Sequence, residues 1–236
     1  MKNEKSSPGG KIIIRPMCKG DMFHNRERSM SAKFYYIYQF RITLEGITPL
    51  IWRQIQVPET YTFWDLHVAI QDAMGWTDSH LHQFEIKNPK TKAELIVGIP
   101  ERTYEGDVID FTTLPGWKLN IRDYLSEENR AMKYLYDFGD GWEHRIELEQ
   151  ILFKGKKRKY PICVAGGRSC PPEDCGGVYG YEDLLEILKN PDHEEYKQMK
   201  MWAGRQFNPE KFDAKKVRFD NPHIRWRKAF VKSRDL

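Results

Sequence analysis

The chain has 236 residues, of which 40% are hydrophobic and 31% are charged, and four are cysteines. This balance is typical of a globular protein with one large domain or two small ones, and it excludes a fibrous or largely disordered chain. The longest apolar runs are too short to cross a bilayer or to form the core of a signal peptide, so we expect a cytoplasmic protein without membrane partners. In that compartment, free thiols or a metal site explain the cysteines better than disulfides do.

The net charge of +4 is distributed unevenly along the chain. Residues 1–31 contain seven Lys/Arg and three Asp/Glu, residues 211–236 contain nine Lys/Arg and three Asp, and the body between them has a net charge of −6. A uniformly basic nucleic-acid-binding protein would not show this separation. We therefore expect a folded domain over 33–213, a basic disordered arm over 1–32 and a basic tail over 214–236.

The predicted strands are segments in which apolar and polar residues alternate between turn residues. They cover residues 34–45, 50–57, 80–87, 94–99, 131–137 and 142–151. The last two flank Gly139-Asp140-Gly141, and an Asp-Gly pair favours a tight turn between antiparallel strands. After this turn, the even positions from Trp142 to Leu148 alternate with charged residues, so we expect the even positions to face the core.

Helix signals are clearest after the second strand. Thr62 and Asp65 have the spacing of a capping box, and Gly75 ends the predicted helix, whose apolar face would pack on the sheet. Further helices are expected over 181–189 and 194–203, and a short one near 119–125 within an otherwise irregular segment. The order of these elements predicts an α+β fold with a mostly antiparallel sheet, packed helices and a single main domain.

Two segments between these elements are dense in residues that bind metals or take part in catalysis. The first is Tyr136–His144, and the second is Cys163–Cys175, which ends in Cys170-Pro-Pro-Glu-Asp-Cys175. No helix or central strand has the composition of the second, so we interpret it as a shaped loop. We expect the fold to bring the two segments together, with His144 near at least one cysteine.

Together with other motifs, these segments resemble the plasmid pRiA4b ORF-3-like family. The residues that carry the resemblance are Phe34–Glu45, Pro49-Leu-Ile-Trp-Arg53, Trp76-Thr-Asp-Ser-His-Leu-His-Gln-Phe84, Asp137-Phe-Gly-Asp-Gly-Trp-Glu-His144, Tyr160-Pro-Ile-Cys163, Cys170–Gly177 and Gly180-Tyr-Glu-Asp183. The resemblance covers residues 33–213. It implies a prokaryotic protein associated with plasmids or other mobile elements, and an α+β fold. It implies no defined biochemical activity.

A zinc site is one hypothesis for the cysteine loop. Zinc favours four nitrogen or sulfur ligands in a tetrahedral array. The candidate ligands are His144, Cys163, Cys170 and Cys175. The spacing departs from that of paired zinc knuckles, which favours the alternative that these cysteines are buried thiols that serve as small apolar side chains.

A hydrolytic centre is the other hypothesis, because carboxylates and an imidazole can hold a cation that activates water. Its candidate residues are Asp137, Asp140, His144, Glu173 and Asp174. Turn formation alone would also explain Asp140-Gly141, and His144 could be a core histidine among apolar neighbours. His80 and His82 could chelate a metal from one strand face, although a turn role and a core role explain them as well.

The sequence thus leaves two functional hypotheses from different classes. The first is a non-enzymatic module that binds a protein or a nucleic acid. In it, the basic ends and the Lys154–Lys159 loop, with five basic residues in six, would provide weak electrostatic affinity for nucleic acid. The alternative is a metal-dependent hydrolase, nuclease-like, that uses the Asp137, Asp140 and His144 region together with the cysteine loop.

Overall fold

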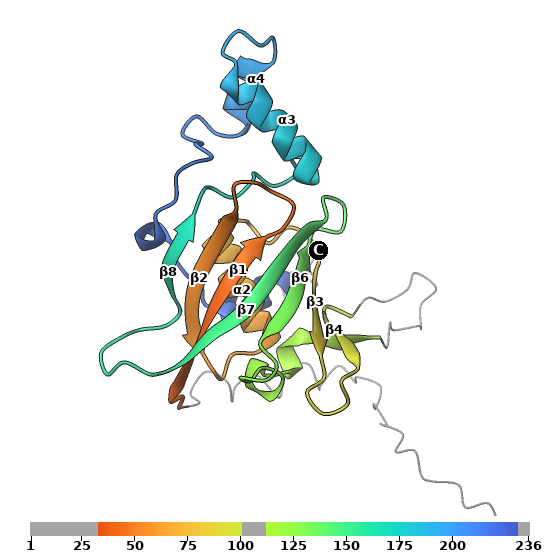
Figure 1. Ribbon diagram of the computed structural model, residues 1–236, viewed down its shortest axis with the longest axis vertical. Coiled ribbons are helices and arrows are strands. Elements are labelled where there is room, and N and C mark those ends of the chain that lie inside the picture. Colours follow the sequence, from red (N-terminus) through yellow and green to blue (C-terminus); the bar gives the residue numbers. More distant parts are fainter. Residues whose placement is uncertain (1–32, 101–111, 231–236) are drawn as a thin grey trace, which may run out of the picture. The chain divides into compact units, whose positions relative to one another are not determined.

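The computed structural model describes residues 33–100 and 112–230. All the elements below belong to residues 34–236, which form one compact unit. Eight strands form one sheet in the order β5-β4-β3-β6-β7-β1-β2-β8 (Figure 1). They are β1 (Tyr36–Leu44), β2 (Ile51–Pro58), β3 (His82–Lys87), β4 (Glu94–Gly98), β5 (Thr113–Pro115), β6 (Ala131–Tyr136), β7 (Trp142–Phe153) and β8 (Ile162–Gly167). All neighbouring pairs are antiparallel except β4 and β5, which confirms the predicted sheet type.

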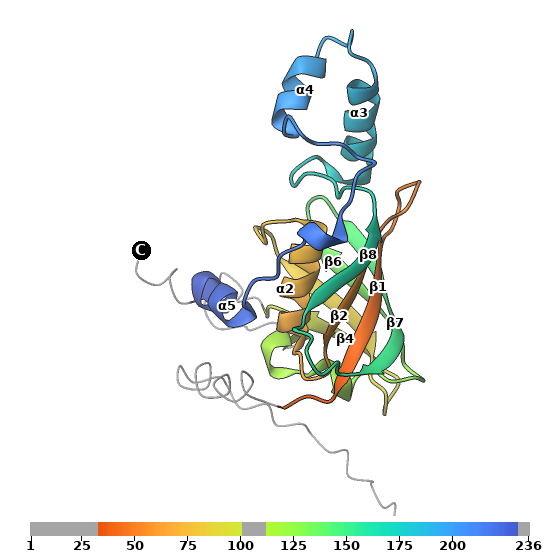
Figure 2. The same cartoon turned by 90° about the vertical axis from the view of Figure 1, so that its left-hand side faces the viewer.

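Four α-helices accompany the sheet in the described part of the chain. They are α2 (Phe63–Met74), α3 (Gly177–Lys189), α4 (Tyr196–Trp202) and α5 (Pro222–Phe230), with three 3-10 turns, η2 (Gly116–Lys118), η3 (Ile121–Asp123) and η4 (Ala214–Lys216). Helix α2 lies against one face of the sheet, and α3 and α4 pack on each other (Figure 2). The predicted α+β class with a single main domain is confirmed. Within the described ranges, no helix is both long and apolar enough to cross a membrane.

Helix α2 begins and ends at the predicted residues. The Thr62 hydroxyl accepts a hydrogen bond from the Asp65 amide (3.1 Å), and the Asp65 carboxylate accepts one from the Thr62 amide (2.9 Å). Gly75 ends the helix at φ +95°, a conformation that side-chain-bearing residues adopt only at a cost. The capping box therefore positions the helix so that its apolar face, including Leu66 and Ile70, is buried in the core.

Strand β7 has the two faces that its alternation predicts. Trp142, Ile146 and Leu148 are buried in the core cluster, whereas Glu143 and Arg145 are exposed. Because side chains alternate across a strand, one register places every second residue from Trp142 to Leu148 on the core side, and the pairing with β1 shifts register beyond Leu148. The predicted burial of this face is confirmed.

Strand β8, at one edge of the sheet, did not emerge from the sequence. It pairs antiparallel with β2, and it is built mostly from small residues that show no alternation. The small residues are required, because a Cβ atom on Gly166 would lie 2.3 Å from the Phe212 ring. Because glycine is needed where the ring packs, β8 lacks the alternation of apolar and polar residues from which strands are predicted.

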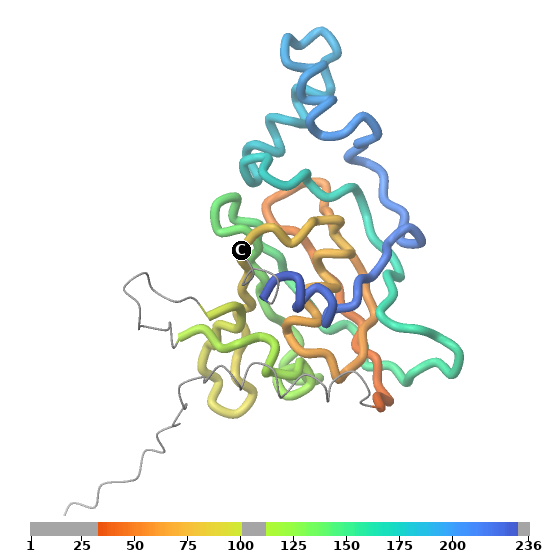
Figure 3. Tube along the Cα trace, turned by 180° about the vertical axis from the view of Figure 1, so that it is seen from behind, coloured from red at the N-terminus to blue at the C-terminus, as the bar shows by residue number. Residues whose placement is uncertain are grey.

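Helix α5 lies within the segment expected to be a basic tail, and it packs on the rest of the fold. Trp226 is buried against Trp64, with ring centroids 5.3 Å apart, and Arg225 Nη2 lies 2.7 Å from an Asp72 carboxylate oxygen. Helix α5 thus packs on the outer side of α2 (Figure 3). The high charge of this segment concealed its apolar anchors, and the folded part continues past residue 213. The predicted arm over 1–32 and residues 231–236 lie outside the described residues.

Candidate functional site

The structure brings the turn between β6 and β7 into contact with the cysteine loop. The Gly176 amide donates a hydrogen bond to the Asp140 carboxylate (3.2 Å). Gly177 approaches the Asp140 carbonyl oxygen so closely that a Cβ atom there would lie 2.4 Å from it. On the other side of the loop, the Trp76 indole donates to the Pro171 carbonyl oxygen (3.0 Å). The two segments singled out in the sequence are therefore neighbours.

Glu173 holds the cysteine loop onto the end of the sheet. One carboxylate oxygen accepts a hydrogen bond from the Tyr136 hydroxyl (2.5 Å), and the other accepts from both the amide (3.0 Å) and the hydroxyl of Thr77. Burial, followed by the neighbouring Glu173 carboxylate, raises the pKa of Tyr136 above its ordinary value, so this hydroxyl stays protonated and donates. Both Glu173 oxygens are occupied, which suits an anchoring role better than a catalytic one.

His144 lies in the core. Its side chain is 1% exposed, and Nδ1 lies 3.1 Å from the Trp142 carbonyl oxygen and 3.3 Å from that of Tyr134, so Nδ1–H donates. Burial lowers the pKa of His144 to about 4. The imidazole is therefore neutral at neutral pH and packs edge-on against Trp76.

The three described cysteines are half-buried free thiols. Burial raises the pKa of Cys163 to about 11 and those of Cys170 and Cys175 to about 12, although the nearby Arg53 guanidinium lowers the first two in part. Zinc binds thiolates, so a zinc site would need these side chains to converge on one point. The predicted set of the three cysteines and His144 does not converge within 4.8 Å in the structure.

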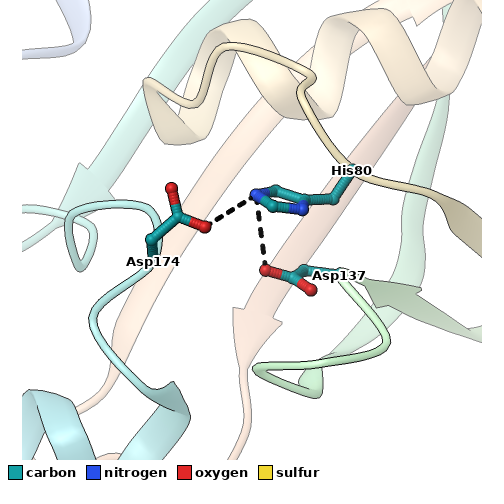
Figure 4. A group of neighbouring side chains, drawn as sticks. All are labelled: His80, Asp137 and Asp174. Carbon is teal, nitrogen blue, oxygen red and sulfur yellow. Dashed lines mark ion pairs between the residues drawn. The ribbon is translucent and has the colours of Figure 1, made fainter.

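A different group does converge at this end of the sheet. In the described part of the chain, His80, Asp137 and Asp174 form the one group of metal-binding side chains with donor atoms within 4.8 Å of one another. His80 Nε2 lies 3.0 Å from Asp174 Oδ1 and 3.6 Å from Asp137 Oδ2 (Figure 4). His80 precedes β3, Asp137 follows β6, and Asp174 lies in the cysteine loop. Both carboxylates were among the candidates expected from the sequence, whereas His80 was considered there only together with His82.

His82 belongs to a separate, buried network beneath α5. Its ring stacks on that of His67 at 3.4 Å, and His67 bridges the Tyr134 hydroxyl (2.8 Å) and the Asp78 carboxylate (2.7 Å). Burial lowers the pKa values of His67 and His82 and raises that of Asp78 to about 6. His80 and His82 therefore do not form a chelating pair. The sequence feature that could have indicated this network is His67, a polar residue on the buried face of α2.

A third group lies at the opposite end of β7, and we call it the basic-aromatic patch. It consists of Tyr35, Tyr36, Phe153 and the Lys154–Tyr160 segment. Phe153 and Tyr35 are 80% and 67% exposed, and the rings of Tyr36 and Phe153 lie 5.3 Å apart. The lysines and the arginine of this segment are exposed as well. The loop that carries them leaves the sheet between β7 and β8 (Figure 1).

Comparison with known proteins places this chain in a family. The profile described as plasmid pRiA4b ORF-3-like protein matches residues 36–216. The chain belongs to this family. This pRiA4b ORF-3-like protein is 32% identical over 169 residues to "Uncharacterized protein y4hQ" of Sinorhizobium fredii (strain NBRC 101917 / NGR234), a match that covers 71% of this chain and 81% of that protein.

A solved relative supports the fold. The crystal structure of the protein of unknown function MM3350 from Methanosarcina mazei Go1 has a TM-score of 0.73 and 46% identity to this chain, covering 79% of this chain and all of that one. The resemblance seen in the sequence is thus confirmed. Neither relative's name assigns an activity, and α5 lies beyond the matched family region.

Proposed function

We propose that this pRiA4b ORF-3-like protein binds single-stranded nucleic acid through the basic-aromatic patch. The observation that carries this proposal is Phe153, which is 80% exposed and stands directly before a loop with five basic residues in six. Packing does not need such a ring at the surface, and apolar rings surrounded by cations mark binding surfaces. The rest of the domain, with its net negative charge, would repel a polyanion and leave this patch as the favoured contact.

The chemistry of the patch favours single strands over duplexes. Lysine and arginine side chains attract phosphates whatever the sequence, whereas exposed rings offer stacking surfaces for bases. Bases in a duplex are already stacked on each other, so exposed rings gain little from them. Tyr35, Tyr36 and Phe153 next to Lys154–Lys159 combine both kinds of contact.

The patch is held in place by the sheet. The Lys154 amide donates to the Tyr35 carbonyl oxygen (2.8 Å), and a Glu59 carboxylate oxygen accepts from the amides of Tyr35 (3.2 Å) and Tyr36 (3.4 Å). The Lys154 ammonium lies 3.9 Å from the centre of the Phe34 ring. Because these contacts fix the backbone beneath the rings, binding would lose little conformational entropy.

The test is the affinity for a fluorescent thymidine oligonucleotide of about 12 nucleotides, measured by anisotropy. Phe153→Ala should weaken binding by about 1–3 kcal/mol, which is the range for one stacked base. A Lys156→Gln/Lys157→Gln double variant should reduce the salt dependence by about 0.7 per phosphate contact removed. Phe138→Ala is the matched control, because Phe138 is a 50% exposed ring in the turn at the other end of β7.

Heparin separates stacking from charge, because it has no bases. Phe153→Ala should leave heparin affinity unchanged, whereas the double lysine variant should lower it. An equal loss of oligonucleotide affinity in the Phe153 and Phe138 variants would count against the patch. The contribution of the basic ends and a protein partner remain predictions from the sequence.

The hydrolase alternative has less support from the residues first named for it. The carboxylates of Asp140 and Glu173 hold the cysteine loop, and His144 is a neutral core residue. Water activation needs groups that face a substrate, and these three face protein. The remaining candidates, Asp137 and Asp174, face His80 instead.

A further inference from the structure

We propose that His80, Asp137 and Asp174 bind one divalent transition-metal ion. Each residue offers a donor atom, and the three atoms lie within 4.8 Å of one another. One imidazole nitrogen and two carboxylate oxygens form a mixed donor set that suits Mn²⁺, Fe²⁺ or Zn²⁺. This inference does not depend on the basic-aromatic patch, which lies at the other end of β7.

The carboxylate of Asp137 is oriented before any ion arrives. Its Oδ1 accepts hydrogen bonds from the amides of Gly139 (2.9 Å) and Asp140 (3.3 Å), and its Oδ2 is the oxygen that faces His80. Metal sites rely on such outer contacts to fix the ligand that touches the ion. Asp137 therefore has one oxygen committed to the turn and one left for coordination.

The surroundings of the other two donors are also fixed. The His80 ring packs edge-on against Tyr136, whose hydroxyl is held by Glu173 and by the Ser79 amide. Asp174 directly follows Glu173, so the same anchor places it beside His80. Side chains positioned by a second layer of hydrogen bonds lose little freedom when they bind an ion.

The charge balance at this group favours a cation. In the described ranges, the ion pairs of Asp137 and Asp174 are with His80 alone, and no lysine or arginine joins them. His80 Nε2 is a buried atom without a hydrogen-bond partner of good geometry, and it faces both carboxylates. A divalent ion at this point would neutralise two carboxylates at once.

The site is open to solvent on one side. The Asp174 side chain is 72% exposed, so an ion can enter and keep water on its free positions. Three protein ligands with open positions are typical of sites at which the metal-bound water remains exchangeable. The described cysteines lie outside this donor set, so a soft, thiol-seeking ion has no advantage here.

Titration of the full chain with Mn²⁺, followed by electron paramagnetic resonance of the free ion, tests the proposal. Mn²⁺ is the suitable probe because it prefers oxygen and nitrogen donors and does not report on thiols. We expect saturable binding of one ion per chain. His80→Gln and Asp137→Asn should each weaken binding at least about tenfold.

The variants are chosen to keep the fold. Asparagine at residue 137 retains the oxygen that accepts from Gly139 and tolerates the φ of +57° found there. Asp174→Asn provides a second, exposed position, and Asp183→Asn on α3 is the matched control that should bind Mn²⁺ as the wild type does. Absence of saturable binding, full binding by the His80 variant, or an equal loss in the Asp183 variant would each overturn the proposal.

Discussion

The two ends of β7 use polar and aromatic side chains in opposite ways. At its start, the carboxylates of Asp140 and Glu173 are bound by protein groups, and the neighbouring rings of Trp76 and Trp142 are buried. At its end, Phe153 and the lysines that follow it are exposed. The comparison teaches that a high density of one residue type does not by itself mark a binding surface, because at the first end most of these side chains hold a loop, whereas at the second end they are exposed.

His80 with its two carboxylates is the exception at the first end. Its neighbours Glu173 and Asp140 are committed to holding the loop, and this is what leaves Asp137 and Asp174 oriented toward one imidazole. A structural scaffold and a candidate ion site thus share one segment. To separate loop stability from ion binding, variants must disturb the contacts that hold the loop without changing the side chains of the proposed ion site.

Gly177→Ala should have the largest effect on this end of β7. The residue has φ +69°, and an added Cβ atom would lie 2.4 Å from the Asp140 carbonyl oxygen, so the loop must move away from the turn. We expect a loss of about 2–4 kcal/mol in the free energy of unfolding, measured in urea. Mn²⁺ affinity should fall with it, since Asp174 is carried by the same loop.

Gly204→Ala is the matched control for that variant. Gly204 also has a positive φ, +95°, but nothing lies within 4 Å of the added Cβ atom. It should cost only the strain of the backbone conformation, about 1–2 kcal/mol. Equal losses in the two variants would show that contact between the loop and the turn contributes nothing measurable.

The pH dependence of stability tests whether His144 is a core residue. Burial lowers the pKa of His144 to about 4, whereas an unfolded histidine titrates near 6.5. Between these values the unfolded chain binds the proton and the folded chain does not, so stability falls as the pH falls from about 6.5 to about 4. At pH 5 this residue should contribute a loss of about 2 kcal/mol relative to pH 7.

His144→Asn isolates that contribution, because the variant has no group that titrates at this position. The slope of unfolding free energy against pH should flatten by up to one proton, about 1.4 kcal/mol per pH unit. The buried His67 and His82 add slopes of the same sign in both proteins, and Asp78, whose pKa is raised, adds one of opposite sign. An unchanged slope in the variant would contradict burial of a neutral imidazole.

Local signals explain which elements could be predicted. The capping box of Thr62 and Asp65, the Asp-Gly turn and the alternation along β7 depend on residues a few positions apart, and all three are confirmed. The interactions that define each of these features are made between residues in one short stretch of chain. Strand β8 and helix α5 depend instead on distant partners, Phe212 for Gly166 and Trp64 for Trp226, and no short stretch contains that information.

The candidate site also combines features that depend on nearby residues with one that depends on distant parts of the chain. Residue type and density pointed to Asp137, Asp174 and the cysteine loop, because turns rarely need so many carboxylates and thiols. The histidine of the proposed ion site could not be identified in this way. Strand β3 begins at His82, so His80 lies just before the strand, where its side chain faces Asp137 in the turn.

Phe153→Ala should have the smallest effect on stability. The ring is 80% exposed and its ring contact is with Tyr36, itself at the surface, so little apolar area returns to water when it is removed. We expect the free energy of unfolding in urea to change by less than about 0.5 kcal/mol, which is the range for surface substitutions. The same variant should lose oligonucleotide affinity, because a base stacks on the ring only in the complex. A loss of stability above about 1 kcal/mol would instead assign Phe153 to the fold, and the contrast between the two ends of β7 would disappear.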